Sequence, residues 1–468
     1  MIADLKPYAE YKESGLLWSP IIPAHWHEER AKRLFTKMER PVRDDDGVVT
    51  CFRDGMVTLR KNRRLAGFTE AIYELGYQGI RRGDLVIHAM DAFAGAVGVS
   101  DSDGKATPVY AVCQARSGAN AYYYAFIVRE MARSQWILAL SRGIRERSTD
   151  FRYAAFGGQR VPFPPPEEQA AIVRFLDWAT GRLERTIRAK RKVIALLNEQ
   201  KQAIIHRAVT RGLDPSVFLK PTGTPWLGDI PQHWEVWRVS HFARVGNGST
   251  PSRANPGYWT KGVCPWLNSS QVNRGFIDSA DQFVTAAALR ECHLPKVAAG
   301  SVLVAITGQG KTRGMSAVLG FEATINQHIA FITPRVPITT AAFLHLALTA
   351  AYLQLRASSE DAGSTKGAIT CEDLKRFKLA IPPLPEQDEL LARIQAETRT
   401  LTHAISRLAR EIELLREYRT RLVADVVTGK LDVREAAAKL PDEAQSETAD
   451  EAVDFGDEAE IIDEEIAA

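Results

Sequence analysis

One segment of the chain has the residue types of a phosphate-binding loop. The stretch Ala305-Ile-Thr-Gly308-Gln-Gly310-Lys311-Thr312 follows a strand-like apolar run and ends in Lys-Thr. Such a loop needs a glycine at its first position and a helix after the Lys-Thr, because the helix amino terminus binds the anion. Ala305 replaces that glycine, and residues 313–320, which include two glycines, predict a turn and a strand. Nucleotide binding therefore stays an alternative and is not the favoured function.

Clusters of basic and polar residues offer a second kind of chemistry. Lys and Arg suit phosphates, while Arg, Gln, Asn and Thr can form hydrogen bonds with base edges. No motif for a catalytic nucleophile, a catalytic metal or a dinucleotide accompanies these clusters. We predict nucleic-acid contacts, with no catalytic residue and no metal ligand, at Arg60, Lys61, Arg63, Arg64, Arg142, Arg145 and Arg147 in the first half and at Ser249, Arg253, Thr307, Gln309, Lys311, Arg313 and Lys366 in the second.

The composition is that of an ordinary globular protein, with 468 residues, of which 45% are apolar and 25% charged. Five cysteines without paired spacing argue against zinc sites and a disulfide framework, and they favour a reducing cytoplasm. Residues 1–6 develop no apolar core of a secretory signal. The most apolar stretch, Ala341–Leu355, is shorter than the roughly 20 residues that a bilayer requires. We therefore expect a cytoplasmic protein that does not enter membranes.

Charge is distributed unevenly along the chain. Residues 441–468 hold 12 acidic side chains and no basic one, which leaves 45 acidic against 60 basic residues in the body. The net charge of +3 thus conceals a body of +15, and such a body suits a polyanionic partner. A solvated basic surface is the alternative. For the acidic tail we expect disorder.

A long internal repeat organises the chain. Six residues of the first half, Lys12, Gly15, Trp18, Pro23, His25 and Trp26, reappear 208 positions later as Lys220, Gly223, Trp226, Pro231, His233 and Trp234. Further pairs reappear 218 positions later, among them Glu168-Gln169 as Glu386-Gln387 and Leu213-Asp214 as Leu431-Asp432. Each half therefore has a matching framework at its two ends and a divergent middle. The middles share a predicted buried strand, at residues 85–87 and 302–304, and a predicted core helix, at 122–140 and 341–355.

Two long helices are predicted after the middles. In each half, several prolines are followed by acidic residues, a pattern that predicts the start of a helix. About 45 residues without proline follow, so each helix is predicted to be long. Apolar residues then follow steps of three and four, as in a coiled-coil seam. The interruptions are Lys190, Lys201 and Arg419. The seam residues are Leu183, Ile187, Ile194, Leu197 and Ile204 in the first helix and Leu401, Ile405, Leu408, Ile412, Leu415 and Leu422 in the second.

Helices of this length run to roughly 65 Å, more than one small domain needs, and each must bury its apolar stripe on a partner. The predicted fold class is therefore α+β or mixed: two α/β globules joined by two long antiparallel coiled-coil helices with a pseudo-twofold internal repeat. A packed helix inside one domain is the alternative.

Taken together, these motifs resemble the specificity subunits of Type I restriction-modification systems over residues 12–432. The resemblance rests on the helix starts Pro164-Pro-Pro-Glu-Glu-Gln169 and Pro382-Pro-Leu-Pro-Glu-Gln387, on the helix ends Val209-Thr-Arg-Gly-Leu-Asp214 and Val427-Thr-Gly-Lys-Leu-Asp432, and on the Ile-Pro-x-His-Trp starts of each half. Residues 57–61, 143–148, 300–310, 326–330 and 363–365 look like segments of two types of target-recognition domain.

The resemblance implies a non-catalytic reader of a bipartite, asymmetric site in double-stranded DNA, with the coiled coil setting the spacing between the half-sites. It implies two modification subunits and two restriction subunits as partners, which would hold S-adenosylmethionine, ATP and Mg²⁺, so that no cofactor is expected in this chain. The implied domains are recognition domains at 1–165 and 213–383, helices at 166–212 and 384–430, and an acidic tail at 431–468. A structural coiled-coil scaffold remains an alternative.

Overall fold

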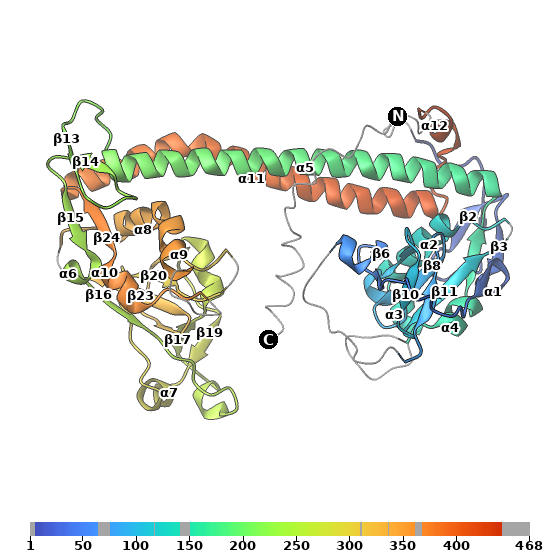
Figure 1. The fold of residues 1–468 in the computed structure, drawn as a ribbon, viewed down its shortest axis with the longest axis horizontal. Coiled ribbons are helices and arrows are strands. Elements are labelled where there is room, and N and C mark those ends of the chain that lie inside the picture. Colours follow the sequence, from blue (N-terminus) through green and yellow to red (C-terminus); the bar gives the residue numbers. More distant parts are fainter. Residues whose placement is uncertain are drawn as a thin grey trace. The chain divides into compact units, whose positions relative to one another are not determined.

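The computed structural model describes residues 5–63, 75–116, 118–140, 150–308, 311–335, 337–360 and 367–441. Two compact units divide the chain: unit 1 comprises Met1–Arg188 with Glu413–Ala468, and unit 2 comprises Ala189–Ile412. The content is mixed α/β with two long helices, α5 (Pro166–Arg211) and α11 (Leu384–Val427), as the sequence predicts (Figure 1). Each long helix contributes residues to both units. No helix among the described residues has the length and apolarity to span a membrane.

Local sequence explains where the long helices begin and end. Pro166 opens α5 with a backbone angle suited to the first helical turn, and Glu167 and Glu168 in that turn complement the helix dipole. The helix ends before Gly212, whose φ of 70° lies in the left-handed region that favours glycine. Helix α11 begins in the same way, with Glu386 in its first turn.

Unit 1 is built around a four-stranded antiparallel sheet in the order β4-β11-β8-β9. Its strands are β4 (Phe35–Lys37), β11 (Tyr110–Ala115), β8 (Leu85–His88) and β9 (Val97–Val99). Four two-stranded ladders accompany it: β1 (Tyr11–Glu13) with β2 (Ile21–Pro23), β3 (His27–Arg30) with β12 (Arg160–Phe163), β5 (Val49–Cys51) with β6 (Val57–Leu59), and β7 (Gln78–Ile80) with β10 (Gly104–Ala106). The shorter helices are α1 (Ala31–Leu34), α2 (Ala121–Arg133), α3 (Trp136–Leu140), α4 (Tyr153–Gly158) and α12 (Arg434–Ala438).

The core of unit 1 includes residues from both long helices. Helix α2 packs on β8 and β9, and its Tyr123 lies in one cluster with Phe175 of α5 and Val426 of α11. The Tyr123 hydroxyl donates to the main-chain oxygen of Val427 at 3.1 Å. Residues after α11 join this core as well, because Val433 is fully buried. The segment 431–440, which the sequence assigned to the tail, is thus packed, while the acidic residues 442–468 lie outside the described residues.

Unit 2 repeats this plan with a larger sheet in the order β16-β23-β20-β21-β18. Its strands are β16 (Ala243–Asn247), β23 (Ile329–Pro334), β20 (Val302–Ala305), β21 (Ser316–Leu319) and β18 (Phe276–Ile277), and a second sheet contains β19 (Gln282–Val284), β17 (Cys264–Leu267) and β22 (Thr324–Ile325). The ladders are β13 (Leu219–Pro221) with β14 (Asp229–Pro231) and β15 (Glu235–Arg238) with β24 (Lys378–Ile381). The shorter helices are α6 (Val239–Phe242), α7 (Ala286–Glu291), α8 (Ala341–Ala350), α9 (Tyr352–Glu360) and α10 (Cys371–Arg376).

The two middles correspond strand by strand despite their divergent sequences. Strands β8 and β20, which the sequence predicts as buried, are the central strands at which the two sheets match. Each predicted core helix is instead a pair of helices. Helix α2 ends before Gln135, whose φ of 62° cannot continue a right-handed helix, and α8 is separated from α9 at Ala351.

Candidate nucleic-acid interface

A glutamate in the first turn of each long helix, buried in unit 1 and half-buried in unit 2, holds the framework of each unit. In unit 1, Glu168 is only 4% exposed and accepts hydrogen bonds from Trp26 Nε1 at 3.0 Å and from the Tyr8 hydroxyl, and its second oxygen lies 2.8 Å from His25 Nε2. In unit 2, Glu386 accepts from Trp234 Nε1 at 2.9 Å and lies 2.8 Å from His233. The repeated His-Trp and Glu motifs are therefore one hydrogen-bonded element, made twice.

The glutamine that follows each glutamate joins the long helix to the first helix of the divergent middle of its unit. Gln387 is fully buried, accepts from the Thr340 amide at 2.9 Å and donates to the oxygens of Ile338 and Pro382 at 2.7 and 2.9 Å. Because Thr340 caps the amino terminus of α8, the glutamine joins that helix to α11. Gln169 makes the equivalent three bonds in unit 1, where it accepts from the amide of Asn120, the cap of α2.

The basic residues of unit 1 follow β6. Arg60 and Lys61 form a short 3₁₀ turn, in which Lys61 is exposed and Arg60 is half-buried with its Nε 3.4 Å from Thr50 Oγ1. Arg63 is largely enclosed, because its guanidinium pairs with Asp54 at 2.7 Å and lies 4.2 Å from the Phe52 ring centre. Lys61 is thus the best placed of these three to meet a polyanion, and Arg63 instead fixes the turn.

In unit 2 the structure brings three predicted segments together around His328. The hydroxyl of Thr307, at the end of β20, lies 2.7 Å from His328 Nδ1. Gln327 bonds to His328 Nε2 at 3.1 Å through its amide and accepts from the Thr250 hydroxyl through its carbonyl. The loops at 248–253, 306–308 and 326–328 are therefore one polar surface of hydroxyl, amide and imidazole groups, the groups that read base edges.

Close backbone packing holds the first of these loops. A side chain at Gly248 would place its Cβ 1.8 Å from the oxygen of Ile325, so only glycine fits there. The Ser249 amide then donates to the same oxygen at 3.1 Å. Arg253 is exposed, yet its guanidinium lies 3.7 Å from the Trp259 ring centre and donates to Gln282 at 2.6 Å. Stacking of this kind fixes the plane of the guanidinium without neutralising its charge.

The segment that resembles a phosphate-binding loop is a turn between two strands. Residues 311–314 follow β20 as a turn and lead into β21, and the Gly314 amide bonds to the oxygen of Ala305 at 2.8 Å. In the described residues 311–320 a strand, and not a helix, follows Thr312, so this stretch lacks the amino-terminal dipole that a phosphate site requires. The nucleotide-binding alternative is therefore wrong for this segment.

The two cations of this turn differ in burial. Lys311 is exposed, and its main-chain oxygen accepts from the Tyr352 hydroxyl of α9 at 2.7 Å. Arg313 is 4% exposed, and a Cβ added at Gly367 would lie 2.0 Å from its guanidinium. Arg313 therefore lies directly against Gly367, and its low exposure makes it a poor candidate for direct contact with DNA, contrary to our expectation from the sequence.

The remaining predicted contacts, Arg64, Arg142, Arg145, Arg147, Gln309 and Lys366, lie outside the described residues. The surface around His328 includes three residues that the prediction of contacts left out, namely Thr250, Gln327 and His328. A signal for them existed, because Asn326-Gln327-His328 stands immediately before a buried strand, at the position where strand ends present side chains to a surface. Among the described residues, no group of three or more His, Cys, Asp or Glu could hold a metal ion.

The predicted seam residues differ in exposure from their neighbours on the long helices. Leu183, Ile187, Ile412 and Leu422 are buried, and Ile194, Leu197, Ile204, Leu401, Ile405, Leu408 and Leu415 are half-buried. Leu196 and Leu414, one position away from the seam, are 56% and 47% exposed.

The polar residues that interrupt the seam find partners on the other long helix. In unit 1, Arg419 of α11 pairs with Glu184 of α5. In unit 2, Lys190 of α5 pairs with Glu411 of α11 at 2.5 Å, and Lys201 donates to Thr402 at 3.2 Å. The interruptions therefore form polar contacts with the other long helix.

Comparison with known proteins indicates which protein family this chain resembles. Residues 231–414, from β14 to within α11, match the family model described as Type I restriction modification DNA specificity domain. This part of the chain is therefore similar to a Type I specificity domain. The resemblance to Type I specificity subunits inferred from the sequence motifs is thereby confirmed. The specificity domain contains the whole surface around His328 and both ends of the framework of unit 2.

Individual relatives agree with the assignment of the specificity domain. The specificity subunit of a Type I restriction enzyme from Escherichia coli is 25% identical over 270 residues, which are 55% of this chain and 60% of that protein. One from Methanocaldococcus jannaschii is 21% identical over 322 residues, 67% of this chain and 69% of that protein. The chain thus spans about three fifths of the length of the first curated relatives it matches.

The fold is also similar to that of a solved chain. A chain from a structural study of complex assembly and conformational transition of the type I R-M system superposes with a TM-score of 0.59 at 17% sequence identity. The match covers 88% of this chain and 99% of the other, so the similarity of fold extends well beyond the specificity domain.

Proposed function

We propose that this chain is the non-catalytic, sequence-specific DNA-binding subunit of a Type I restriction-modification complex. The observation that carries the proposal is that one framework is built twice while the loops on it differ. Glu168 and Glu386 hold equivalent Trp-His pairs, yet unit 1 offers Lys61 beside an enclosed Arg63, whereas unit 2 offers a hydroxyl and amide surface around His328. Two equivalent frameworks that present different loops suit a bipartite and asymmetric site in double-stranded DNA.

The long helices support the second part of the proposal, that they pair antiparallel as a coiled coil and set the spacing between the half-sites. In unit 2, contacts run from Lys190 to Glu411 and from Lys201 to Thr402. The residue number rises on α5 as it falls on α11, which is the pattern of antiparallel neighbours. The recognition domains in this proposal are residues 1–165 and 213–383, joined by the helices at 166–212 and 384–430.

The partners in this proposal are two modification subunits and two restriction subunits in the cytoplasm. Methylation of a base requires the base to leave the stack, and in this proposal the modification subunits perform that chemistry. S-adenosylmethionine, ATP and Mg²⁺ would therefore bind in the partner subunits, and this chain would contribute the choice of site.

The test is modified-base sequencing of host DNA with and without the gene for this chain, followed by point variants. Loss of N6-methyladenine from one split motif on deletion is the expected result, and the motif gives both half-sites. Exchange of Gln327 and Thr250 for alanine should then change the preference at one half-site only. A split motif that survives deletion would refute the proposal, and a motif that no surface variant alters would favour a structural scaffold.

A further inference from the structure

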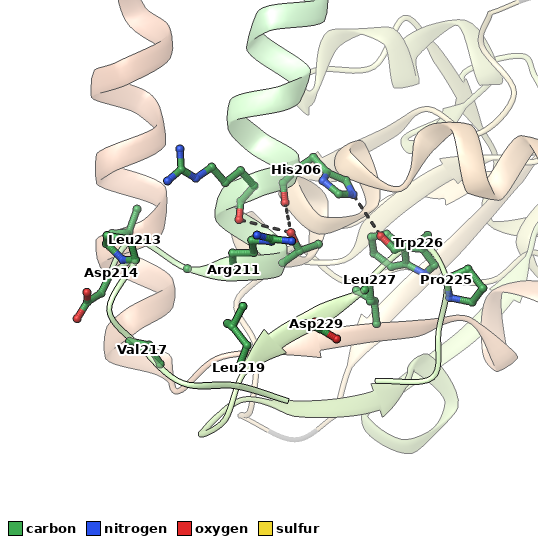
Figure 2. Close-up of a pocket in the computed structure, with 15 residues that line it drawn as sticks. His206, Arg211, Leu213, Asp214, Val217, Leu219, Pro225, Trp226, Leu227 and Asp229 are labelled. Atoms are coloured by element: carbon green, nitrogen blue, oxygen red, sulfur yellow. Dashed lines mark hydrogen bonds between the residues drawn. The ribbon is translucent and has the colours of Figure 1, made fainter. Parts of the chain in front are cut away.

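A cavity of about 510 Å³ lies in unit 2 between the last turns of α5 and the β13–β14 hairpin (Figure 2). Its walls include Gly212, Leu213 and Leu219 on one strip of chain and Trp226 and Leu227 on the returning one. Leu213 and Leu219 are 39% and 42% exposed, so the apolar walls face solvent. The volume falls within the range of roughly 300–1,000 Å³ that is typical of ligand sites. The proposed reading of DNA makes no use of this cavity.

Three polar side chains that line the cavity form hydrogen bonds within the chain. The ring of His206 bonds to the oxygen of Trp226 at 3.2 Å, and the Thr210 hydroxyl donates to the oxygen of His206 at 2.7 Å (Figure 2). Asp214 accepts from the amide and the hydroxyl of Ser216 at 2.8 and 2.6 Å. The charged lining is of both signs, because it includes Arg207 and Arg211 as well as Asp214 and Asp229. This lining favours a neutral occupant over an anion.

The internal repeat indicates which neutral occupant fits. Strand β13 repeats β1 with an offset of 208, so Leu219 stands where unit 1 has Tyr11. The helix ends repeat with an offset of 218, so Gly212 stands where unit 1 has Lys430. In unit 1, the Tyr11 hydroxyl donates to the main-chain oxygen of Lys430 at 3.0 Å and links the hairpin to the helix end. In unit 2, Leu219 has neither the ring nor the hydroxyl, and the cavity lies between Leu219 and Gly212.

We propose that the cavity is a docking pocket for a tyrosine side chain of a partner protein. The incoming ring takes the place that the Tyr11 ring has in unit 1, against Leu213, Leu219 and Leu227, and its hydroxyl donates to the main-chain oxygen of Gly212. The phenol matches the lining because its ring is apolar and its one polar group is neutral. The two units therefore differ in this position as well as in their loops. In unit 1 the position is filled by Tyr11 of the same chain, and in unit 2 it is filled by a tyrosine of another chain. This inference is independent of DNA reading.

The test is a titration of the full chain with N-acetyltyrosinamide, followed by the methyl signals of leucine in NMR spectra. Saturable shifts at Leu213, Leu219 and Leu227 are expected. N-acetylphenylalaninamide should bind about three- to tenfold more weakly, because it lacks one hydrogen bond. No saturation with N-acetyltyrosinamide, or equal binding of the two amides, would overturn the proposal.

Two substitutions separate the cavity from other apolar surfaces. Leu219→Tyr should fill the pocket from within and abolish binding, while the matched control Leu17→Tyr, at a position that is 80% exposed in unit 1, should leave binding unchanged. Tyr11→Leu should open the equivalent place in unit 1 and raise the stoichiometry from one to two. Binding by Leu219→Tyr at the wild-type affinity would exclude this cavity as the site.

Discussion

Exchange of Gln387 for methionine should destabilise the contact between α8 and α11 by about 3 kcal/mol. The two side chains have similar length, so packing changes little, but three hydrogen bonds are lost at a residue that is 0% exposed. Each is worth about 1 kcal/mol net, and the donor and acceptors left behind remain desolvated. The loss should concentrate at the amino terminus of α8, because the Thr340 amide is one of the partners.

Hydrogen exchange followed by mass spectrometry measures this loss locally. A destabilisation of about 3 kcal/mol corresponds to roughly a hundredfold faster exchange in peptides covering residues 338–350. The matched control is Gln202→Met on the exposed face of α5, which should change exchange less than about twofold, since such surface substitutions stay within ±0.5 kcal/mol. Exchange in Gln387→Met within threefold of wild type would refute the reasoning that this buried amide anchors the recognition part of unit 2.

Three further outcomes are expected. Lys311→Ala should weaken the binding of one half-site and Arg145→Ala the binding of the other, by about 1–3 kcal/mol for a base contact. The extent of methylation at each motif measures this effect, and full methylation by both variants would contradict the choice of contacts. Burial lowers the pKa of His345 below its ordinary value near 6.5. As the pH falls through 6.5, the unfolded chain therefore takes up a proton before the folded chain does. The free energy of unfolding of unit 2 should then fall between pH 7.5 and 5.5, by at most 1.4 kcal/mol per pH unit. In urea unfolding, His345→Asn should flatten this pH dependence. Deletion of residues 442–468, which hold 12 acidic residues, should raise nonspecific DNA affinity and steepen its salt dependence; an unchanged salt slope would exclude shielding by the tail.

The framework could be predicted from the sequence because its residues occur in both halves of the internal repeat. Repeated Trp, Glu and Gln at fixed offsets signalled equivalent positions, and the proline stops gave the starts of α5 and α11 within a residue or two. The bonds themselves could not be predicted, because Trp26 and Glu168 are 142 positions apart and nothing local joins them. The break of the first core helix could not be predicted either, since Gln135 carries no turn signal although it adopts a positive φ.

The recognition loops are harder to predict because charge alone does not tell which side of a turn a residue occupies. Lys311 and Arg313 lie two positions apart in one glycine-bearing segment, and composition treats them alike. The turn between β20 and β21 leaves Lys311 exposed and buries Arg313 to 4% exposure against Gly367. A buried cation must be compensated by neighbouring groups, so Arg313 is a poorer candidate than Lys311 for contact with a base. Under the proposed function, the packing of the loops therefore decides which cations are available to DNA, and the divergent loops must be compared by structure before their residues are assigned to a half-site.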